Sequence, residues 1–413
     1  MRTEVTVTGT ASMTQDPIDR IAVVEPEKPM IPRILGDLSG SGSKQSAGEK
    51  PPTLICVGGL HGNEPAGVEA LKRVFARLEA DPSCLVGRAV GLSGNRQALA
   101  NRKRFLEDDL NRHWIPARVE RLHQSGQKLR AEDMELVELD RELQTLLDEA
   151  EGLVYFLDIH TTSGEGPAFV NLDDTLPNRR FAMAFPAPLV VGLEEELEGT
   201  LVSYLVPRGV ISLGFEAGQH NNPASVDRAE AAIWIALELA GVIRPESRPE
   251  VEEARRQLEA VTAGLPHVVE VLYRHPVYPD DGFRMDPGFV NFDPIKAGAP
   301  LAHDREGLIL AQENGYLLMP LYQSLGSDGF FVIRKVHPIW LKVSEWARRS
   351  HLERFIHLFP GVKRHPETAG SYIVDRRLAR WWALELFHLL GYQRRGGRYD
   401  RFLIMSRRSY YDL

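Results

Sequence analysis

The sequence has few cysteines, no long apolar run and no excess of positive charge. Two cysteines, Cys56 and Cys84, occur among 413 residues, which excludes a disulfide framework and fits a reducing compartment. No apolar run approaches the ~20 residues that cross a bilayer, and the first residues lack the apolar core of a secretory signal. The 57 Asp and Glu outnumber the 49 Lys and Arg, so no overall basic field attracts nucleic acid. We therefore expect a cytoplasmic protein without nucleic-acid or membrane partners.

The sequence does contain the alternation of strand-like and helix-like segments that is typical of an α/β domain. Hydrophobic residues make up 43%, enough for a large core, and the length fits two domains with an appendage. Over residues 31–245 the alternation predicts a mostly parallel mixed sheet flanked by helices. The predicted strands cover 53–57, 86–92, 153–157 and 209–215, and the predicted helices cover 68–78, 133–147 and 229–239.

The remaining segments differ from this pattern. Residues 1–30 have no clear assignment, although 5–7 and 21–24 resemble short strands. Strand-like runs separated by Gly and Pro predict a smaller β-rich domain over residues 260–338. Residues 339–413 are rich in tryptophan and predict a helical C-terminal extension.

The most informative segment is GGLHGNEPAG at residues 58–67. It follows a predicted strand and opens a predicted helix, so it lies at the carboxyl end of the sheet, where open α/β sheets place their sites. His61 and Glu64 are three residues apart across a turn, which lets an imidazole and a carboxylate point at one zinc ion. Alone, this spacing is common by chance, and a solvated polar turn is the alternative interpretation.

A second polar strand end supplies another imidazole. The segment LDIHTTSG at residues 157–164 places His160 where a buried strand ends. Asp158 shares its face of the strand and can orient the ring. The alternative is a hydrogen-bonded core histidine. Two histidines and one carboxylate leave the fourth position of zinc open for water, as a catalytic site requires, so we predict one Zn²⁺ per chain.

A third strand ends in an acidic residue. The segment LGFEAGQ at residues 213–219 places Glu216 between apolar residues and glycines. A carboxylate beside a zinc-bound water can take its proton and return it to a leaving nitrogen. Without the other two strand ends, a simply exposed carboxylate would be the preferred interpretation.

A basic cluster occupies residues 95–112. Arginine presents a planar fork that matches a carboxylate through two parallel bonds. In an acidic protein, such a cluster indicates a local site for an anionic substrate. The alternative, an exposed charged loop, fits Arg102 and Lys103 better than Arg104 and Arg112.

Together these motifs resemble the succinylglutamate desuccinylase/aspartoacylase family, zinc enzymes with a carboxypeptidase A-like α/β fold. The resemblance depends on GGLHGNE at 58–64, DLNR at 109–112, DIHTTS at 158–163 and EAGQ at 216–219, in that order. It covers residues 31–240 strongly and extends weakly to about residue 340. Asn95-Arg96, where the family often has Asn-Pro, and the tail after Ile339 depart from the family pattern.

The resemblance implies a role for each residue that matches a motif. His61, Glu64 and His160 would be the zinc ligands, and Glu216 would be the catalytic general base.

The resemblance also implies residues that hold the substrate. Arg104, Asn111 and Arg112 align with positions that bind a substrate carboxylate and polarise the scissile carbonyl, with Arg104 stabilising the developing charge. Tyr322 is the nearest candidate for a tyrosine that the family takes from its β domain. Arg208, eight residues before the expected base, is a candidate for a further substrate arginine.

We therefore predict a zinc-dependent hydrolase that cleaves the amide bond of an N-acyl amino acid or a related small carboxylated amide. The first alternative is a carboxypeptidase-like enzyme that acts on peptides or peptidoglycan fragments. The second, of another class, is an inactive metal-binding interaction protein with the C-terminal tail as its working surface. The sequence leaves open the acyl group, the amino acid and whether the chain forms a homo-oligomer.

Overall fold

The structure is a computed structural model of the 413-residue chain. It describes residues 30–40, 50–126, 129–244, 248–350, 356–366, 371–375, 378, 390, 392–395 and 402–407. The short strands expected at 5–7 and 21–24 lie outside the described residues.

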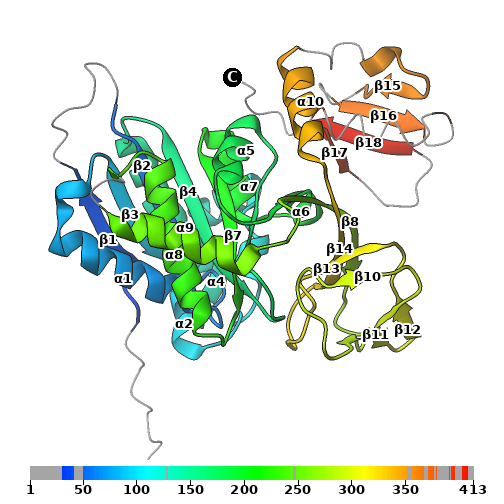
Figure 1. The fold of residues 1–413 in the computed structure, drawn as a ribbon, viewed down its shortest axis with the longest axis horizontal. Helices are drawn as coiled ribbons and strands as arrows, with labels where there is room; N and C mark the ends of the chain where they lie inside the picture. The colour runs from blue at the N-terminus through cyan, green and yellow to red at the C-terminus, as the bar shows by residue number, and fades with distance from the viewer. Residues whose placement is uncertain are drawn as a thin grey trace, which may run out of the picture.

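A large mixed sheet forms the centre of the molecule (Figure 1). Over the described residues it has 11 strands in the order β1-β3-β2-β4-β7-β5-β6-β8-β14-β13-β10. The neighbours β3, β2, β4 and β7 run parallel, as do β5, β6 and β8, whereas β1 pairs antiparallel at one edge. The strands of the first half are β1 (Ile34–Ser39), β2 (Thr53–Gly58), β3 (Arg88–Ser93), β4 (Val154–Thr162), β5 (Phe169–Asn171), β6 (Leu189–Val191) and β7 (Ile211–Gln219).

Helices cover both faces of this half of the sheet. One face carries α1 (Ala66–Ala80), α5 (Leu176–Met183), α8 (Ala224–Leu239) and α9 (Pro249–Thr262). The other face carries α3 (Pro116–Gln124), α4 (Ala131–Glu149) and α7 (Leu201–Leu205). Shorter helices are η1 (Pro82–Cys84), α2 (Arg96–Asn101), η2 (Leu110–Arg112), α6 (Leu193–Glu196) and η3 (Val206–Arg208). Among the described helices, none is long and apolar enough to cross a membrane.

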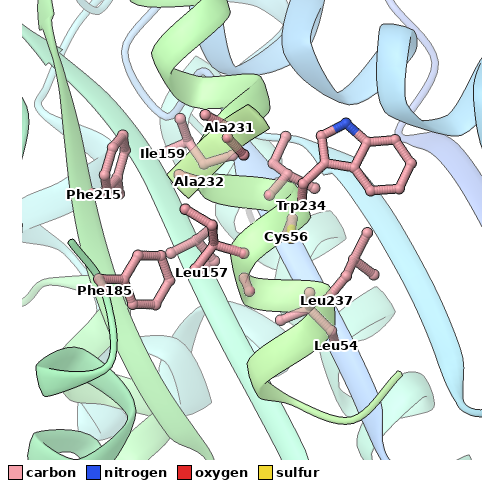
Figure 2. Close-up of a cluster of buried hydrophobic side chains, with 14 of the residues drawn as sticks. Leu54, Cys56, Leu157, Ile159, Phe185, Phe215, Ala231, Ala232, Trp234 and Leu237 are labelled. Atoms are coloured by element: carbon pink, nitrogen blue, oxygen red, sulfur yellow. The ribbon is translucent and has the colours of Figure 1, made fainter. Parts of the chain in front are cut away.

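The core follows the two-residue period of the buried strands. Along β2, Leu54 and Cys56 pack toward α1 and α8, whereas Ile55 and Val57 pack toward α4. Figure 2 shows the first of these layers, in which Trp234 of α8 lies over the sheet. Because both faces are covered, β2 is buried throughout, as its continuous apolar run indicates. The predicted α/β sheet flanked by helices is therefore confirmed.

The β-rich region shares strands with the main sheet. Its strands are β8 (Val268–Pro276), β9 (Arg284–Met285), β10 (Pro294–Ile295), β11 (Pro300–Asp304), β12 (Gly307–Leu310), β13 (Gly315–Leu318) and β14 (Asp328–Lys335). β8 pairs with β6 on one side and with β14 on the other, while β12, β11 and β9 form a separate small sheet. The domain boundary expected at residue 260 stays a prediction. The β6–β8 pairing hydrogen-bonds the β-rich region to the main sheet.

The prediction of a helical C-terminal extension was wrong for most of the residues that the structure describes there. Helix α10 (Pro338–Arg349) begins the extension, but a four-stranded antiparallel sheet follows it. Its strands are β15 (Val362–Arg364), β16 (Ser371–Asp375), β17 (Tyr392–Arg395) and β18 (Phe402–Arg407). The aromatic and β-branched run of β16, with buried Tyr372 and Val374 on one face, has the two-residue period of a strand. The prediction of a helical tail relied on the tryptophan content and overlooked this two-residue period.

Candidate metal centre and active site

Three neighbouring parallel strands bring their polar ends to one edge of the sheet. β2, β4 and β7 run side by side, so the turn after β2 lies beside the ends of β4 and β7. His160 of β4 is directly opposite Glu216 of β7 in the register. Neither belongs to the layer that contains Phe215 and Ile159, so both point toward the other face of the sheet. The strand-end positions predicted from the sequence therefore meet.

The turn between β2 and α1 is shaped by close backbone packing. Gly59 has a φ of +77°, and a side chain there would also approach Leu99 to 2.8 Å. The Gly62 N–H donates to the Arg104 carbonyl over 3.1 Å, and the Glu64 N–H donates to the His61 carbonyl over 3.1 Å. These bonds hold the two candidate ligands of the turn on the same side.

His61, Glu64 and His160 form a compact group of buried ligand atoms. One ligand atom from each residue lies within 4.8 Å of the others. The Glu64 carboxylate bridges the rings, with Oε1 2.8 Å from Nδ1 of His61 and Oε2 3.2 Å from Nδ1 of His160. Two imidazole nitrogens and one carboxylate oxygen are ligands that zinc accepts, and three protein ligands leave a position for water. The donor set therefore fits a catalytic zinc site.

Carboxylates orient both rings from behind. Nε2 of His61 lies 3.0 Å from Oδ1 of Asp109, and Nε2 of His160 lies 3.0 Å from Oδ2 of Asp158. Both Nδ1 atoms consequently face Glu64. A carboxylate on the far nitrogen fixes the tautomer and makes an imidazole a better metal ligand.

The charges of this group call for a cation. Burial would lower the pKa of His160, but Asp158 and Glu64 raise it well above its usual range. Burial would raise the pKa of Glu64, but His61 and His160 hold it well below its usual range. A histidine that keeps its proton among buried carboxylates supplies positive charge that a divalent ion can supply instead.

Glu216 is a buried carboxyl group with a free oxygen. Its side chain is 8% exposed, and Oε2 is buried without a hydrogen-bond partner. Burial raises the pKa of Glu216 to about 8; His160 opposes this shift, and Glu64 and Asp158 add to it. A carboxyl group whose pKa lies near neutrality can both accept and donate a proton in a reaction.

Arg104 lies beside the candidate metal ligands. Its Nη2 donates to Oδ2 of Asp109 over 3.0 Å, and its Nη1 is 3.5 Å from Oε1 of Glu64. The loop that follows it is held by the buried carboxylate of Glu132, which accepts the N–H groups of Leu106 and Glu107. A guanidinium fixed at this place can stabilise negative charge that develops on a bound carbonyl.

Asn111 and Arg112 are engaged by the protein itself. Nδ2 of Asn111 is 3.3 Å from Nε2 of His160, and its Oδ1 accepts the Leu201 N–H over 2.9 Å. Arg112 donates from Nη1 to the Asn111 carbonyl over 2.9 Å and from Nη2 to Asp328 of β14 over 2.9 Å. Their expected contact with a substrate carboxylate stays a prediction.

The structure does not bring Arg208 to the other site residues. It precedes β7, whereas Glu216 lies toward the far end of that strand, about 16 Å away at the rise of an extended chain. Its guanidinium covers the ring of Tyr204 at 3.8 Å and is exposed. Arg208 ends η3 before β7 begins, and its expected contact with a substrate stays a prediction.

Tyr322 lies on the loop between β13 and β14. Its N–H donates to Oγ of Ser163, close in sequence to His160. Its hydroxyl donates to the carbonyl of Asp286 over 2.8 Å and accepts the N–H of Phe289 over 3.0 Å. The hydroxyl therefore holds the β-rich region together, and its contact with a substrate stays a prediction.

A chain of hydrogen bonds that the sequence did not indicate reaches Glu64 from the β-rich region. Gln323 Oε1 accepts from Asn63 over 2.8 Å and from Nε2 of His220 over 3.3 Å. Nδ1 of His220 then accepts the Thr161 hydroxyl over 2.7 Å, and the Thr161 N–H donates to Oε2 of Glu64 over 2.9 Å. No local motif marks these residues, although His220 follows the EAGQ segment directly.

Comparison with known proteins identifies the family that part of this chain resembles. Residues 50–240 match the family model of the succinylglutamate desuccinylase/aspartoacylase catalytic domain. The resemblance to this family that the sequence indicated is therefore confirmed over residues 50–240, a little under half of the chain. The matched range contains His61, Glu64, His160 and Glu216, whereas Tyr322 and the β-rich region lie outside it.

The curated relatives of this chain are distant. A succinylglutamate desuccinylase of Pseudomonas aeruginosa is 30% identical over 108 residues, which cover 26% of this chain and 30% of the relative. The match thus spans less than a third of the curated relative.

Solved structures support the fold of the family. A succinylglutamate desuccinylase/aspartoacylase from Rhodobacter sphaeroides has a TM-score of 0.53 at 22% identity, covering 71% of this chain and 87% of that one. A succinylglutamate desuccinylase from Vibrio parahaemolyticus has a TM-score of 0.51 at 15% identity, covering 73% and 91%.

Proposed function

We propose that the chain is a zinc-dependent hydrolase that cleaves the amide bond of an N-acyl amino acid or a related small carboxylated amide. The observation that supports this most directly is the meeting of His61, Glu64 and His160 beside the buried, unpartnered oxygen of Glu216. The match of residues 50–240 to the succinylglutamate desuccinylase/aspartoacylase catalytic domain supports hydrolytic deacylation as the reaction class.

A zinc ion held by His61, Glu64 and His160 would polarise the scissile carbonyl and acidify a bound water. Oε2 of Glu216 accepts a proton from the attacking water and delivers it to the leaving nitrogen as the C–N bond breaks. Arg104 stabilises the negative charge on the carbonyl oxygen while the water oxygen adds to the carbonyl carbon. Asp109 and Asp158 keep the two imidazoles oriented throughout.

The test combines metal content with amide hydrolysis. We expect the purified protein to hold one zinc per chain and His61→Ala to lose it, because one of three protein ligands is removed. Elemental analysis measures the zinc, and release of free amino acid from N-acyl amino acids and dipeptides measures activity. His303→Ala is a suitable control, because His303 pairs with Asp286 in the β-rich region.

Each outcome separates the proposal from its alternatives. Hydrolysis of N-acyl amino acids but not dipeptides supports it, whereas faster release from dipeptides favours a peptidase. Stoichiometric zinc without activity on any amide favours a metal-binding interaction protein. Normal zinc content in His61→Ala would refute the ligand assignment.

A further inference from the structure

We propose that Asp328 occupies the anion position beside Arg112 from within the chain, so that the enzyme favours substrates that present a neutral group there. This inference rests on the proposed function and narrows its substrate class. Oδ2 of Asp328 accepts from Nη2 of Arg112 over 2.9 Å, and Oδ1 accepts from Nε of Arg274 over 2.5 Å. One carboxylate of the β-rich region thus lies between two guanidinium groups, as a bound anion would.

Each terminal nitrogen of Arg112 already donates one hydrogen bond within the protein. Nη1 donates to the carbonyl of Asn111, and Nη2 donates to Asp328. A substrate carboxylate binds arginine most tightly through two parallel bonds, which requires a free fork. A carboxylate that uses the same Nη2 donor has to displace Asp328, and a partner on the same chain competes at a high effective concentration.

Arg112 belongs to the same short segment that contacts the metal ligands. Asp109 lies against His61, and Asn111 lies 3.3 Å from His160. The side chain of Arg112 is 22% exposed and that of Asp328 is 12% exposed, so bulk water screens their interaction weakly. Burial would lower the pKa of Arg112, but Asp109 and Asp328 raise it, so the guanidinium stays charged. The ion pair between Arg112 and Asp328 therefore acts next to the reaction centre.

The positive charges around the centre do not exceed the negative ones, so none is left over for a substrate with several carboxylates. The carboxylates that face one another here are Glu64, Asp109, Asp158, Glu216 and Asp328. The guanidinium groups that meet them are those of Arg104, Arg112 and Arg274. Glu194 also acts on Arg112, so even with a divalent ion the positive charges do not exceed the negative charges around the centre. Each additional carboxylate on a substrate therefore adds unbalanced negative charge.

The experiment uses amides that differ in one carboxylate. At the amino-acid end, N-acetylglutamine is compared with N-acetylglutamate, and at the acyl end N-succinamylalanine is compared with N-succinylalanine. For the zinc-loaded wild type we expect kcat/KM to be about tenfold higher for the neutral member of at least one pair. Asp328→Asn frees Arg112 and is expected to raise kcat/KM for the carboxylated member of that pair by about tenfold.

Glu270→Gln is the matched control. Glu270 of β8 pairs with Arg334 of β14, so this change removes one carboxylate from the same pair of strands. We expect it to leave the preference within each pair unchanged.

The outcomes are distinct for the two proposals. A wild type that releases no amino acid from any of the four compounds overturns the proposed function and this inference with it. A wild type that hydrolyses amides but prefers the carboxylated member of both pairs overturns this inference alone. So does a folded Asp328→Asn variant with an unchanged preference, or a Glu270→Gln variant with the same shift. If Asp328→Asn does not fold, the wild-type preference decides.

Discussion

At the scale of single residues, Glu216 shows how the fold sets the chemistry of a carboxyl group. The sheet buries its side chain, Oε2 has no hydrogen-bond partner, and the pKa rises to about 8. An ordinary surface glutamate has solvent to stabilise its charge. Here the charges that favour the ionised form are those of His160 and Arg104, and a metal ion held by the neighbouring residues would add to them.

We expect Glu216→Gln to retain zinc but to lose about 10²- to 10⁴-fold in kcat, because the amide keeps the shape of the side chain and cannot accept the proton. Elemental analysis and steady-state kinetics on an N-acyl amino acid measure both effects. Glu69→Gln, on the surface of α1 beside Lys72, is the control and should keep full activity. A fully active Glu216→Gln variant would exclude the residue as the base.

The sequence indicated the residues that lie on strand ends and missed those that arrive from elsewhere. His160 and Glu216 could be predicted because parallel strands align their carboxyl ends and alternate residues share a face. Asp328 and Gln323 reach the site from the β-rich region, and their contacts depend on how that region packs rather than on a local pattern. Arg208 was included on its spacing from Glu216 alone, and the structure places its guanidinium over Tyr204 instead of beside the other site residues.

At the scale of elements, the turn after β2 depends on α2. Asn95 caps this helix by accepting the Ala98 N–H over 3.0 Å and donates to Glu132 over 3.1 Å. The helix then lies directly against Gly62, the residue after His61. Helix α2 has six residues, too few to show a helical period of apolar residues, so it could not be predicted. The same holds for strands β5 and β6, which have three residues each. Longer elements such as α4 and β2 could be predicted to within a few residues.

Gly62→Ala is therefore expected to disturb the metal site without removing a ligand. A Cβ at this position would lie 2.0 Å from the carbonyl carbon of Ala98, so the backbone has to move. We expect a loss of about 1–3 kcal/mol in the free energy of unfolding and a weaker affinity for zinc, measured by denaturation and by chelator competition.

Gly126→Ala is the control, since a Cβ there meets nothing within 4 Å. A Gly62→Ala variant as stable and as tightly metal-bound as this control would contradict the packing argument.

At the scale of the whole molecule, a buried ion cluster attaches the C-terminal extension to the catalytic sheet. Arg348 of α10 donates to Oδ2 of Asp174 over 2.7 Å, and Arg179 of α5 donates to the same oxygen over 2.6 Å. Burial would raise the pKa of Asp174, but Arg179 and Arg348 hold it well below its usual range. The negative charge of Asp174 therefore contributes to holding α10 against α5, beside the bond from Arg179 to Ser344.

Asp174→Asn should destabilise the protein in a pH-dependent way. Because the folded pKa is depressed, the carboxylate contributes stability above its unfolded value of about 3.9 and loses that contribution as the pH falls toward the folded value. Breaking such a buried pair costs about 3–5 kcal/mol at pH 7, and the difference from wild type should shrink below about pH 4.

Urea denaturation at several pH values measures this difference. Asp227→Asn is the control, because its pair with Arg73 is exposed and contributes about 1 kcal/mol or less. A constant difference between Asp174→Asn and wild type from neutral to acidic pH would contradict the assignment.

The pairing of β6 with β8 joins the main sheet and the β-rich region in one folding unit. If the chain were cut after α8, the short strand Leu189–Val191 would offer bare N–H and C=O groups as a template for other chains. A truncated enzyme should therefore aggregate rather than become less selective. Substitutions in the loops and side chains of the region that contributes Asp328 should be tolerated better than changes that break the β6–β8 pairing.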